Sequence, residues 1–168
     1  MSGLPPLHDG FGPLPLPWVR HVTTPHMWRE GLPGESEDDF TSRLASELDR
    51  VILEEGPETI AAFIAEPVMG AGGVMPPPRG YHQAVQAVLR KYGILYIADE
   101  VITGFGRIGK RFGSEVFGIE PDLVSVAKAL TSSYIPMGAA LVTPKVADVI
   151  AESAHSHGQF AHGYTYGE

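Results

Sequence analysis

The sequence predicts an α/β fold built on a mostly parallel sheet, and three observations support this. Short apolar runs at residues 59–65, 94–98 and 123–127 are each bounded by turn residues, as buried parallel strands are. Amphipathic segments with helical spacing alternate with them, which is typical of strands joined by crossover helices. The chain has 168 residues, 43% hydrophobic and 19% charged, which suffices for one domain with a hydrophobic core.

The composition also excludes several classes of function. A formal net charge of −8 argues against nucleic acid or a membrane surface as a partner. Without cysteine there is neither a disulfide framework nor a thiolate metal site. No apolar run approaches the length of a membrane span, and the proline-rich N-terminus lacks the pattern of a secretory signal. We therefore expect a cytoplasmic protein.

The chain divides into two parts by composition. Residues 1–35 are rich in proline and glycine and predict an irregular N-terminal arm, whose Trp18 and Trp28 are expected to pack on the domain. Residues 36–168 are expected to form part of a larger globular domain.

Two helices are predicted in the first half of the domain. Ser36 can cap a helix that begins with three acidic residues, and apolar residues recur at helical spacing until Gly56. A second amphipathic pattern covers residues 81–92 and stops at Gly93. Since this second helix lies between two predicted strands, it has the place of a crossover helix.

The second half is less regular. Residues 103–118 are rich in glycine and carry no long periodic pattern. A further strand is predicted over residues 137–142, and Pro144 is predicted to open a helix. The tail from residue 155 to residue 168, with His155, His157 and His162, is expected to be a loop. Because no acidic or cysteine ligand accompanies these histidines, we interpret them as ordinary loop residues rather than a metal site.

Charged side chains follow three of the predicted strands. The first ends in Glu66, the second in Asp99-Glu100, and the third in Lys128. Parallel strands present their carboxyl ends at one edge of the sheet, where ligands bind in this architecture. These residues are therefore expected to meet at a site.

Lys128 and Asp99 each allow a structural and a chemical interpretation. A single lysine after a strand is usually a surface residue, and a single aspartate is usually a cap or loop carboxylate. Together they supply what pyridoxal 5'-phosphate needs, an amine that binds its aldehyde and an acid that keeps its ring nitrogen protonated. A partly buried lysine would also have a lowered pKa, which favours attack on an aldehyde.

A dinucleotide site is the main alternative. Residues 104–109 match the G-x-G-x-x-G pattern, and Asp122 follows 18 residues after Gly104. The glycines of that motif should follow a strand at once and open a helix. Here residues 99–103 intervene, and Gly113 and Gly118 interrupt the segment after the match, so the pattern is interpreted as a chance occurrence.

Four ordered segments resemble class III pyridoxal-phosphate-dependent aminotransferases of the ω-amino acid type. The segment 97–107 (IADEVITGFGR) resembles their aspartate motif, and 127–132 (AKALTS) their lysine motif. Residues 65–73 and 162–166 resemble the blocks upstream and downstream. The resemblance covers about residues 34–166 and implies the large domain of fold-type I enzymes.

The resemblance also implies roles for particular residues. Lys128 would bind the cofactor covalently and then move the substrate's Cα proton, while Asp99 would pair with the pyridine nitrogen. Val101 would pack on the ring, and Thr165 would donate to the cofactor phosphate of a neighbouring subunit in a homodimer. Glu66 would organise the site through hydrogen bonds. The reaction would transfer an amino group from an amine or ω-amino acid to a keto acid.

Departures from the family pattern qualify these expectations. Ala71 and Ile102 stand where branches that use 4-aminobutyrate or ornithine carry glutamate and glutamine, which favours pyruvate over 2-oxoglutarate as acceptor. Family members are more than twice as long, so we expect a fragment that is truncated at both ends and inactive alone. An aminomutase or decarboxylase of the same fold, or a catalytically inert fragment, stays open.

Overall fold

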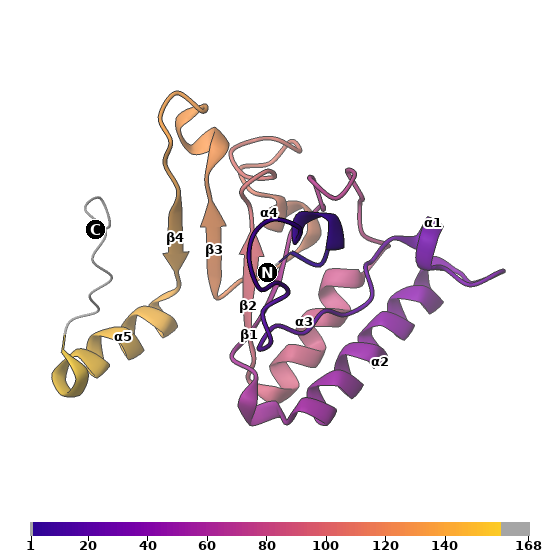
Figure 1. Cartoon of the computed structure of the whole chain (residues 1–168), viewed down its shortest axis with the longest axis horizontal. Coiled ribbons are helices and arrows are strands. Elements are labelled where there is room, and N and C mark those ends of the chain that lie inside the picture. Colours follow the sequence, from indigo (N-terminus) through magenta and orange to yellow (C-terminus); the bar gives the residue numbers. More distant parts are fainter. Residues whose placement is uncertain (1, 159–168) are drawn as a thin grey trace.

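The computed structural model describes residues 2–158 as helices on a four-stranded sheet, shown in Figure 1. In chain order the elements are η1 (Pro5–Leu7), α1 (Met27–Glu30), α2 (Glu37–Glu55), η2 (Pro57–Thr59), β1 (Ala62–Ala65), α3 (Tyr81–Tyr92), β2 (Leu95–Asp99), α4 (Gly113–Phe117), β3 (Leu123–Val126), η3 (Lys128–Thr131), β4 (Ala139–Val142) and α5 (Pro144–His157), where η marks a 3₁₀-helix. The predicted α/β class is confirmed.

The sheet has the order β1-β2-β3-β4. Strands β1, β2 and β3 pair in parallel, while β4 returns antiparallel to β3. Helix α3 connects β1 to β2, as the sequence predicts for a crossover. The first three strands therefore share one direction, and their carboxyl ends lie at the same edge.

The hydrophobic core lies between the sheet and two helices that run in the same direction, since Thr41 near the start of α2 contacts Arg79 just before α3, and Asp49 further along α2 contacts Lys91 at the end of α3. Helices α2 and α3 pack together beside β1 and β2 (Figure 1). Phe40 on α2 and Leu89 on α3 are 0% and 2% exposed, and Ala98 on β2 is also fully buried. The apolar residues that predict both helices are thus mostly the residues that form the core, because the same spacing places them on one helical face.

The N-terminal arm runs along α2 in the opposite direction. Arg20 forms a 2.6 Å ion pair with Glu55 at the end of α2. The Thr23 amide donates a hydrogen bond to Glu47, which lies earlier in the same helix. The division into an N-terminal arm (residues 1–35) and a domain (residues 36–168) stays a prediction. Val22 in the arm packs against the hydrophobic core of the domain.

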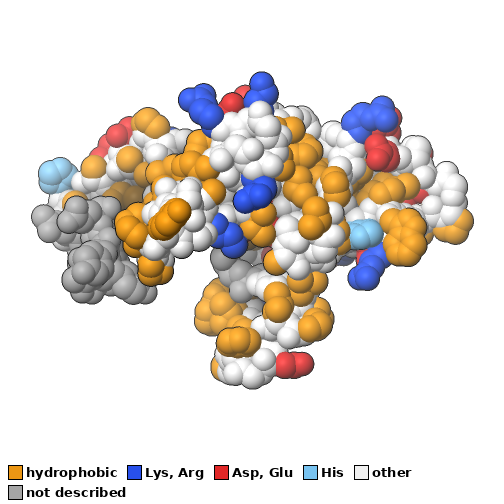
Figure 2. All heavy atoms as spheres, turned by 90° about the horizontal axis from the view of Figure 1, so that it is seen from above, with side chains coloured by type: hydrophobic (Ala, Val, Ile, Leu, Met, Phe, Trp, Pro, Cys, Tyr) orange, Lys and Arg blue, Asp and Glu red, His pale blue; other side chains and the backbone are white. Residues whose placement is uncertain are grey.

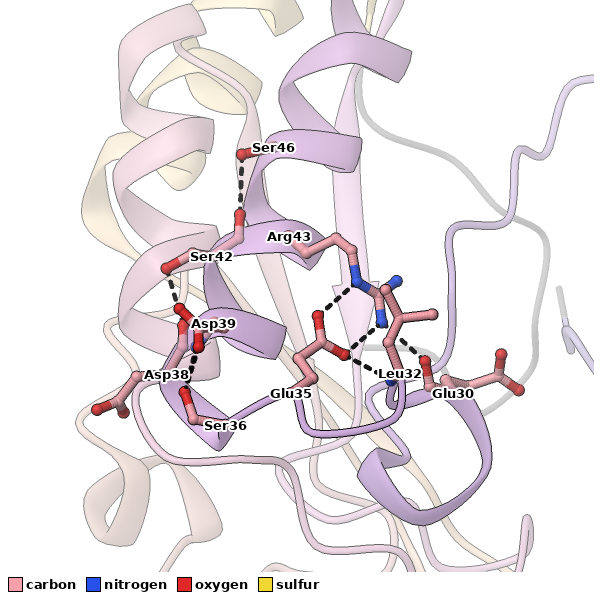
Figure 3. Close-up of polar contacts among 9 residues, drawn as sticks. All are labelled: Glu30, Leu32, Glu35, Ser36, Asp38, Asp39, Ser42, Arg43 and Ser46. Atoms are coloured by element: carbon pink, nitrogen blue, oxygen red, sulfur yellow. Dashed lines mark hydrogen bonds and ion pairs between the residues drawn. The ribbon is translucent and has the colours of Figure 1, made fainter.

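The start of α2 is fixed by polar contacts, which Figure 3 shows. Ser36 caps the helix by accepting a hydrogen bond from the Asp39 amide, as predicted. Just before it, Glu35 accepts hydrogen bonds from the Arg43 guanidinium at 2.7 and 2.9 Å and from the Leu32 amide. The Arg43 hydrogen bonds, followed by the Leu32 amide, lower the pKa of Glu35 to about 2.

The far end of the sheet is much less covered. All four residues of β4 are exposed, and α5 has no buried residue. Hydrophobic side chains reach the surface over much of the face that Figure 2 shows from above. Of the three strands expected to be buried, β2 alternates buried and half-buried residues, while β1 and β3 are mostly half-buried. No helix in the described part of the chain is long and apolar enough to cross a membrane.

Several local predictions are wrong. Residues 57–59 form a 3₁₀-helix, so the first strand is shorter than expected. The short helix α4 forms inside the glycine-rich stretch. Helix α5 includes His155 and His157, for which the sequence predicts a loop. Trp18 and Trp28 do not pack on the domain, because they are 76% and 87% exposed.

His82 connects α3 to the sheet from a buried position. It is 1% exposed, with Nδ1 2.8 Å from the Tyr96 hydroxyl and Nε2 3.1 Å from the Pro67 carbonyl oxygen. A carbonyl only accepts, so Nε2 carries the proton and Nδ1 accepts from Tyr96. Burial lowers the pKa of His82 from the ordinary value of 6.5, so the folded chain holds the ring neutral.

Because the pKa of His82 is lowered in the folded chain, we expect the free energy of unfolding to decrease in mild acid. Because the unfolded chain binds the proton at a higher pH than the folded chain, the contribution is complete above pH 6.5 and falls as pH drops below that value. The free energy of unfolding should fall by up to about 1.4 kcal/mol per pH unit through this residue. Urea unfolding between pH 7.5 and 5 should show a weaker pH dependence for His82→Gln. The exposed His155→Gln should keep the wild-type slope, and equal slopes in all three proteins would contradict the assignment.

Candidate functional site at the carboxyl edge of the parallel strands

The parallel pairing brings the predicted site residues to one edge of the sheet. Ala65 pairs with Ala98, so Glu66 and Asp99, each one residue further on, stand at the same level of neighbouring strands. Asp99 in turn pairs with Ser125 on β3, and Lys128 begins η3 two residues after that strand ends. Neighbouring strands lie about 4.8 Å apart, so the three backbones are close together. The segments that follow β2 and β3 extend from this edge in Figure 1.

Asp99 is half-buried at the end of β2. Its Oδ1 accepts a 3.1 Å hydrogen bond from the amide of Val101, which turns the chain away from the strand. A carboxylate offers about four acceptor positions, so Asp99 can also accept from a ligand. The side chain of Val101 is half-buried beside it.

Glu66 shapes the loop that follows β1. Its Oε2 accepts a 2.8 Å hydrogen bond from the Gly70 amide, and Met69 and Met75 close the loop with two backbone hydrogen bonds. A Cβ atom at Gly70 would lie 2.4 Å from the Ile102 side chain, so glycine allows this loop to touch the segment after β2. Glu66 thus holds the loop after β1 in place by binding the backbone amide of Gly70.

Lys128 lies in an unusual backbone conformation. Its φ is 40°, and Ser132 and Ser133 at the end of the same turn also have positive φ values of 53° and 62°. A non-glycine residue in this region costs about 1–3 kcal/mol, and such residues cluster at functional sites. The expectation of a partly buried lysine is wrong for this chain, in which Lys128 is exposed.

Thr165, which the sequence also predicts as a site residue, lies outside the described residues, as does His162.

The dinucleotide alternative can be compared with the structure. In the G-x-G-x-x-G match, Gly106 and Gly109 occupy turns with positive φ, and α4 begins only at residue 113. Asp122 lies before β3, at the opposite edge, where it accepts from the Tyr96 amide. The elements of a dinucleotide site are therefore not brought together. Residues 2–158 contain no group of three or more histidines and acids placed to hold a metal ion.

Sequence reasoning missed Glu100, which it noted only as the neighbour of Asp99. Glu100 is 0% exposed and accepts hydrogen bonds from Thr103, Gly113 and Ser114. A weak signal was available, because hydroxyl residues follow it within a glycine-rich stretch. The burial itself depends on how the loop folds back, which periodicity does not reveal.

The chain belongs to the class III aminotransferases. A sequence model of that family, described as Aminotransferase class-III, matches residues 2–168. The chain is 60% identical over 166 residues to a probable gamma-aminobutyrate transaminase 2, mitochondrial, of Oryza sativa subsp. indica. It is 61% identical over 166 residues to a gamma aminobutyrate transaminase 3, chloroplastic, of Solanum lycopersicum. Each alignment covers 99% of this chain.

Solved structures agree with this assignment. The omega transaminase from Pseudomonas jessenii in complex with PMP superimposes with a TM-score of 0.93 at 55% identity, over 97% of this chain and 36% of that one. The chain spans 33% of the length of the rice relative and 32% of that of the tomato relative. It therefore corresponds to about a third of a fold-type I transaminase, as expected for a fragment.

A side chain at position 113 should destabilise this edge of the sheet, because the backbone of Gly113 is closely packed. A Cβ atom there would lie 2.8 Å from Pro67 Cβ and 2.9 Å from Thr103 Cβ, between the segments that follow β1 and β2. Gly113→Ala gains up to about 1 kcal/mol from the reduced freedom of the unfolded chain, but overpacking costs about 1–3 kcal/mol, so we expect net destabilisation. Urea unfolding measures it. Gly138→Ala, whose Cβ would come no nearer than 3.3 Å to Val126 O, is the control and should change less. A Gly113→Ala variant as stable as wild type would contradict the close packing.

Proposed function

We propose that this chain is the lysine-bearing core of a pyridoxal 5'-phosphate-dependent transaminase. The observation that carries the proposal is the placement of Asp99 at the end of β2 and of Lys128 shortly after the neighbouring parallel strand β3, at one edge of the sheet. Membership of the aminotransferase family supports it, as does the PMP bound in a structural relative. The complete enzyme is proposed to act as a homodimer.

The residues at this edge fit the cofactor in chemical type. When bound, pyridoxal phosphate supplies an aldehyde and an electron-accepting ring. The exposed amine of Lys128 would hold the cofactor's aldehyde and would move the proton of the substrate's Cα. Asp99 would accept a hydrogen bond from the protonated ring nitrogen, and Val101 would pack on the ring. Thr165 would donate to the cofactor phosphate of the neighbouring subunit, and Glu66 holds the adjacent loop through the Gly70 amide.

The proposed substrates are an amine or ω-amino acid donor and a keto acid acceptor. The relatives' names favour 4-aminobutyrate as a donor. Pyruvate is proposed ahead of 2-oxoglutarate on the basis of Ala71 and Ile102. A cytoplasmic location is also a proposal, since these relatives carry mitochondrial and chloroplastic names.

The isolated 168-residue chain is proposed to be inactive. The exposed strand β4 and the uncovered helix α5 leave apolar surface that a larger domain would bury. Exposed strand edges also favour aggregation. Titration of the chain with pyridoxal phosphate tests this, because a tight visible absorption band that depends on Lys128 would contradict it.

Replacement of Lys128 tests the central assignment. In a full-length protein that carries residues 1–168, borohydride reduction should attach the cofactor permanently to the peptide containing Lys128, as mass spectrometry would detect. Lys128→Ala should abolish this attachment, because it removes the amine that binds the aldehyde. Lys110→Ala, in an exposed loop, is the control and should trap the cofactor normally. Attachment at another lysine in Lys128→Ala would refute the assignment.

Replacement of Asp99 tests the proposed support of the ring nitrogen. Asp99→Asn should still bind the cofactor but slow removal of the Cα proton by roughly 10²–10³-fold, since an amide does not stabilise the protonated ring as a carboxylate does. Stopped-flow absorbance of the first half-reaction measures this rate. Asp148→Asn on the exposed surface of α5 is the control. A wild-type rate in Asp99→Asn would show that Asp99 lacks this role.

A further inference from the structure

Glu100 has a buried carboxylate whose hydrogen-bond donors all lie in residues 103–114. Its Oε2 accepts from the Thr103 hydroxyl at 2.5 Å and from the Gly113 amide at 2.9 Å. Its Oε1 accepts from both the amide and the hydroxyl of Ser114 at 2.6 Å. An ionised group without solvent is costly unless it is hydrogen-bonded, and here four donors compensate the burial.

The pattern of donors requires a carboxylate in particular. The two backbone amides, of Gly113 and Ser114, donate to different oxygens of Glu100. A glutamine has one acceptor oxygen and one NH₂ group, so one of the two amides would face a donor. A buried donor without a partner loses its full solvation free energy, so glutamine should be a poor substitute despite its equal size.

The backbone of Glu100 is fixed as firmly as its side chain. Its amide donates to Ser125 O on β3 at 2.9 Å, and its carbonyl accepts from Gly104 at 2.9 Å. Asp99 and Val101 lie directly before and after it, and the hydrogen bond from the Val101 amide to Asp99 Oδ1 spans Glu100. Any shift of Glu100 therefore changes the turn that orients Asp99.

We propose that Glu100 is a positioning residue that fixes the Asp99–Val101 turn by clamping the loop of residues 103–114 beneath it. The inference rests on the proposed function for the meaning of Asp99, but the clamp itself is a property of this chain. Glu100 holds Asp99 and Val101, the residues that would support the cofactor ring, and being fully buried it would act only through them.

Amide hydrogen exchange of the 168-residue chain, read by NMR, tests the clamp without cofactor. In Glu100→Gln the amides of Gly113 and Ser114 should exchange roughly 10–100-fold faster, since charge-assisted hydrogen bonds are lost. The decisive readout is the Val101 amide, which reports its hydrogen bond to Asp99 and should also exchange faster. A purely local structural role would loosen residues 113 and 114 and leave Val101 unchanged, which would overturn the proposal.

Two further variants keep the test decisive. Glu115→Gln, at an exposed acid in α4 that pairs with Arg111, is the matched control and should leave the Val101 amide unchanged. Thr103→Val removes one donor but keeps both backbone amides, so it serves if Glu100→Gln does not fold. Faster Val101 exchange in Thr103→Val supports the clamp, and unchanged exchange overturns it.

The outcome is separable from that of the proposed function. Failure of the cofactor to attach at Lys128 would refute the proposed function and leave the exchange result intact. Unchanged Val101 exchange beside normal attachment at Lys128 would refute the clamp alone.

Discussion

The parallel pairing of β1, β2 and β3 is the constraint on which the rest of this structure depends. Parallel strands all point their carboxyl ends the same way, and the observed register places Glu66 level with Asp99. Glu66 precedes Asp99 by 33 positions in the sequence (99 − 66), and Asp99 precedes Lys128 by 29 (128 − 99). The parallel pairing nevertheless brings all three to one edge of the sheet. Had β2 run antiparallel to its neighbours, Asp99 would lie at the opposite edge from Glu66 and Lys128, and no common site would exist.

Buried polar groups hold this edge in place. His82 on α3 forms hydrogen bonds with Tyr96 on β2 and with the Pro67 carbonyl after β1. Glu100 accepts hydrogen bonds from the amides of Gly113 and Ser114 in the segment after β2. Gly113 lies where these two segments touch. A buried polar group without a partner is costly, so each of these contacts excludes other arrangements of the loops. The edge is thereby shaped by residues that are not themselves expected to touch a ligand.

The two ends of the sheet differ in how completely they are covered. Helices α2 and α3 bury the side of β1 and β2, whereas β4 and α5 have no buried residue among them. The chain spans about a third of the relatives that it matches. The exposed end is consistent with a segment whose remaining contacts belong to a larger domain.

The sequence by itself determined the fold class, the two core helices and the ends of the three parallel strands, because these follow from local periodicity and turn residues. It also identified the family from short motifs, since Asp99, Lys128 and their neighbours are close in sequence within each motif. Periodicity could not reveal α4, the strained backbone of Lys128 or the burial of Glu100. Helix α4 and the burial of Glu100 depend on how a glycine-rich loop without periodic pattern folds against the sheet, and the backbone of Lys128 depends on how the chain turns after β3. Only the tertiary structure decides which donors of that loop surround one carboxylate.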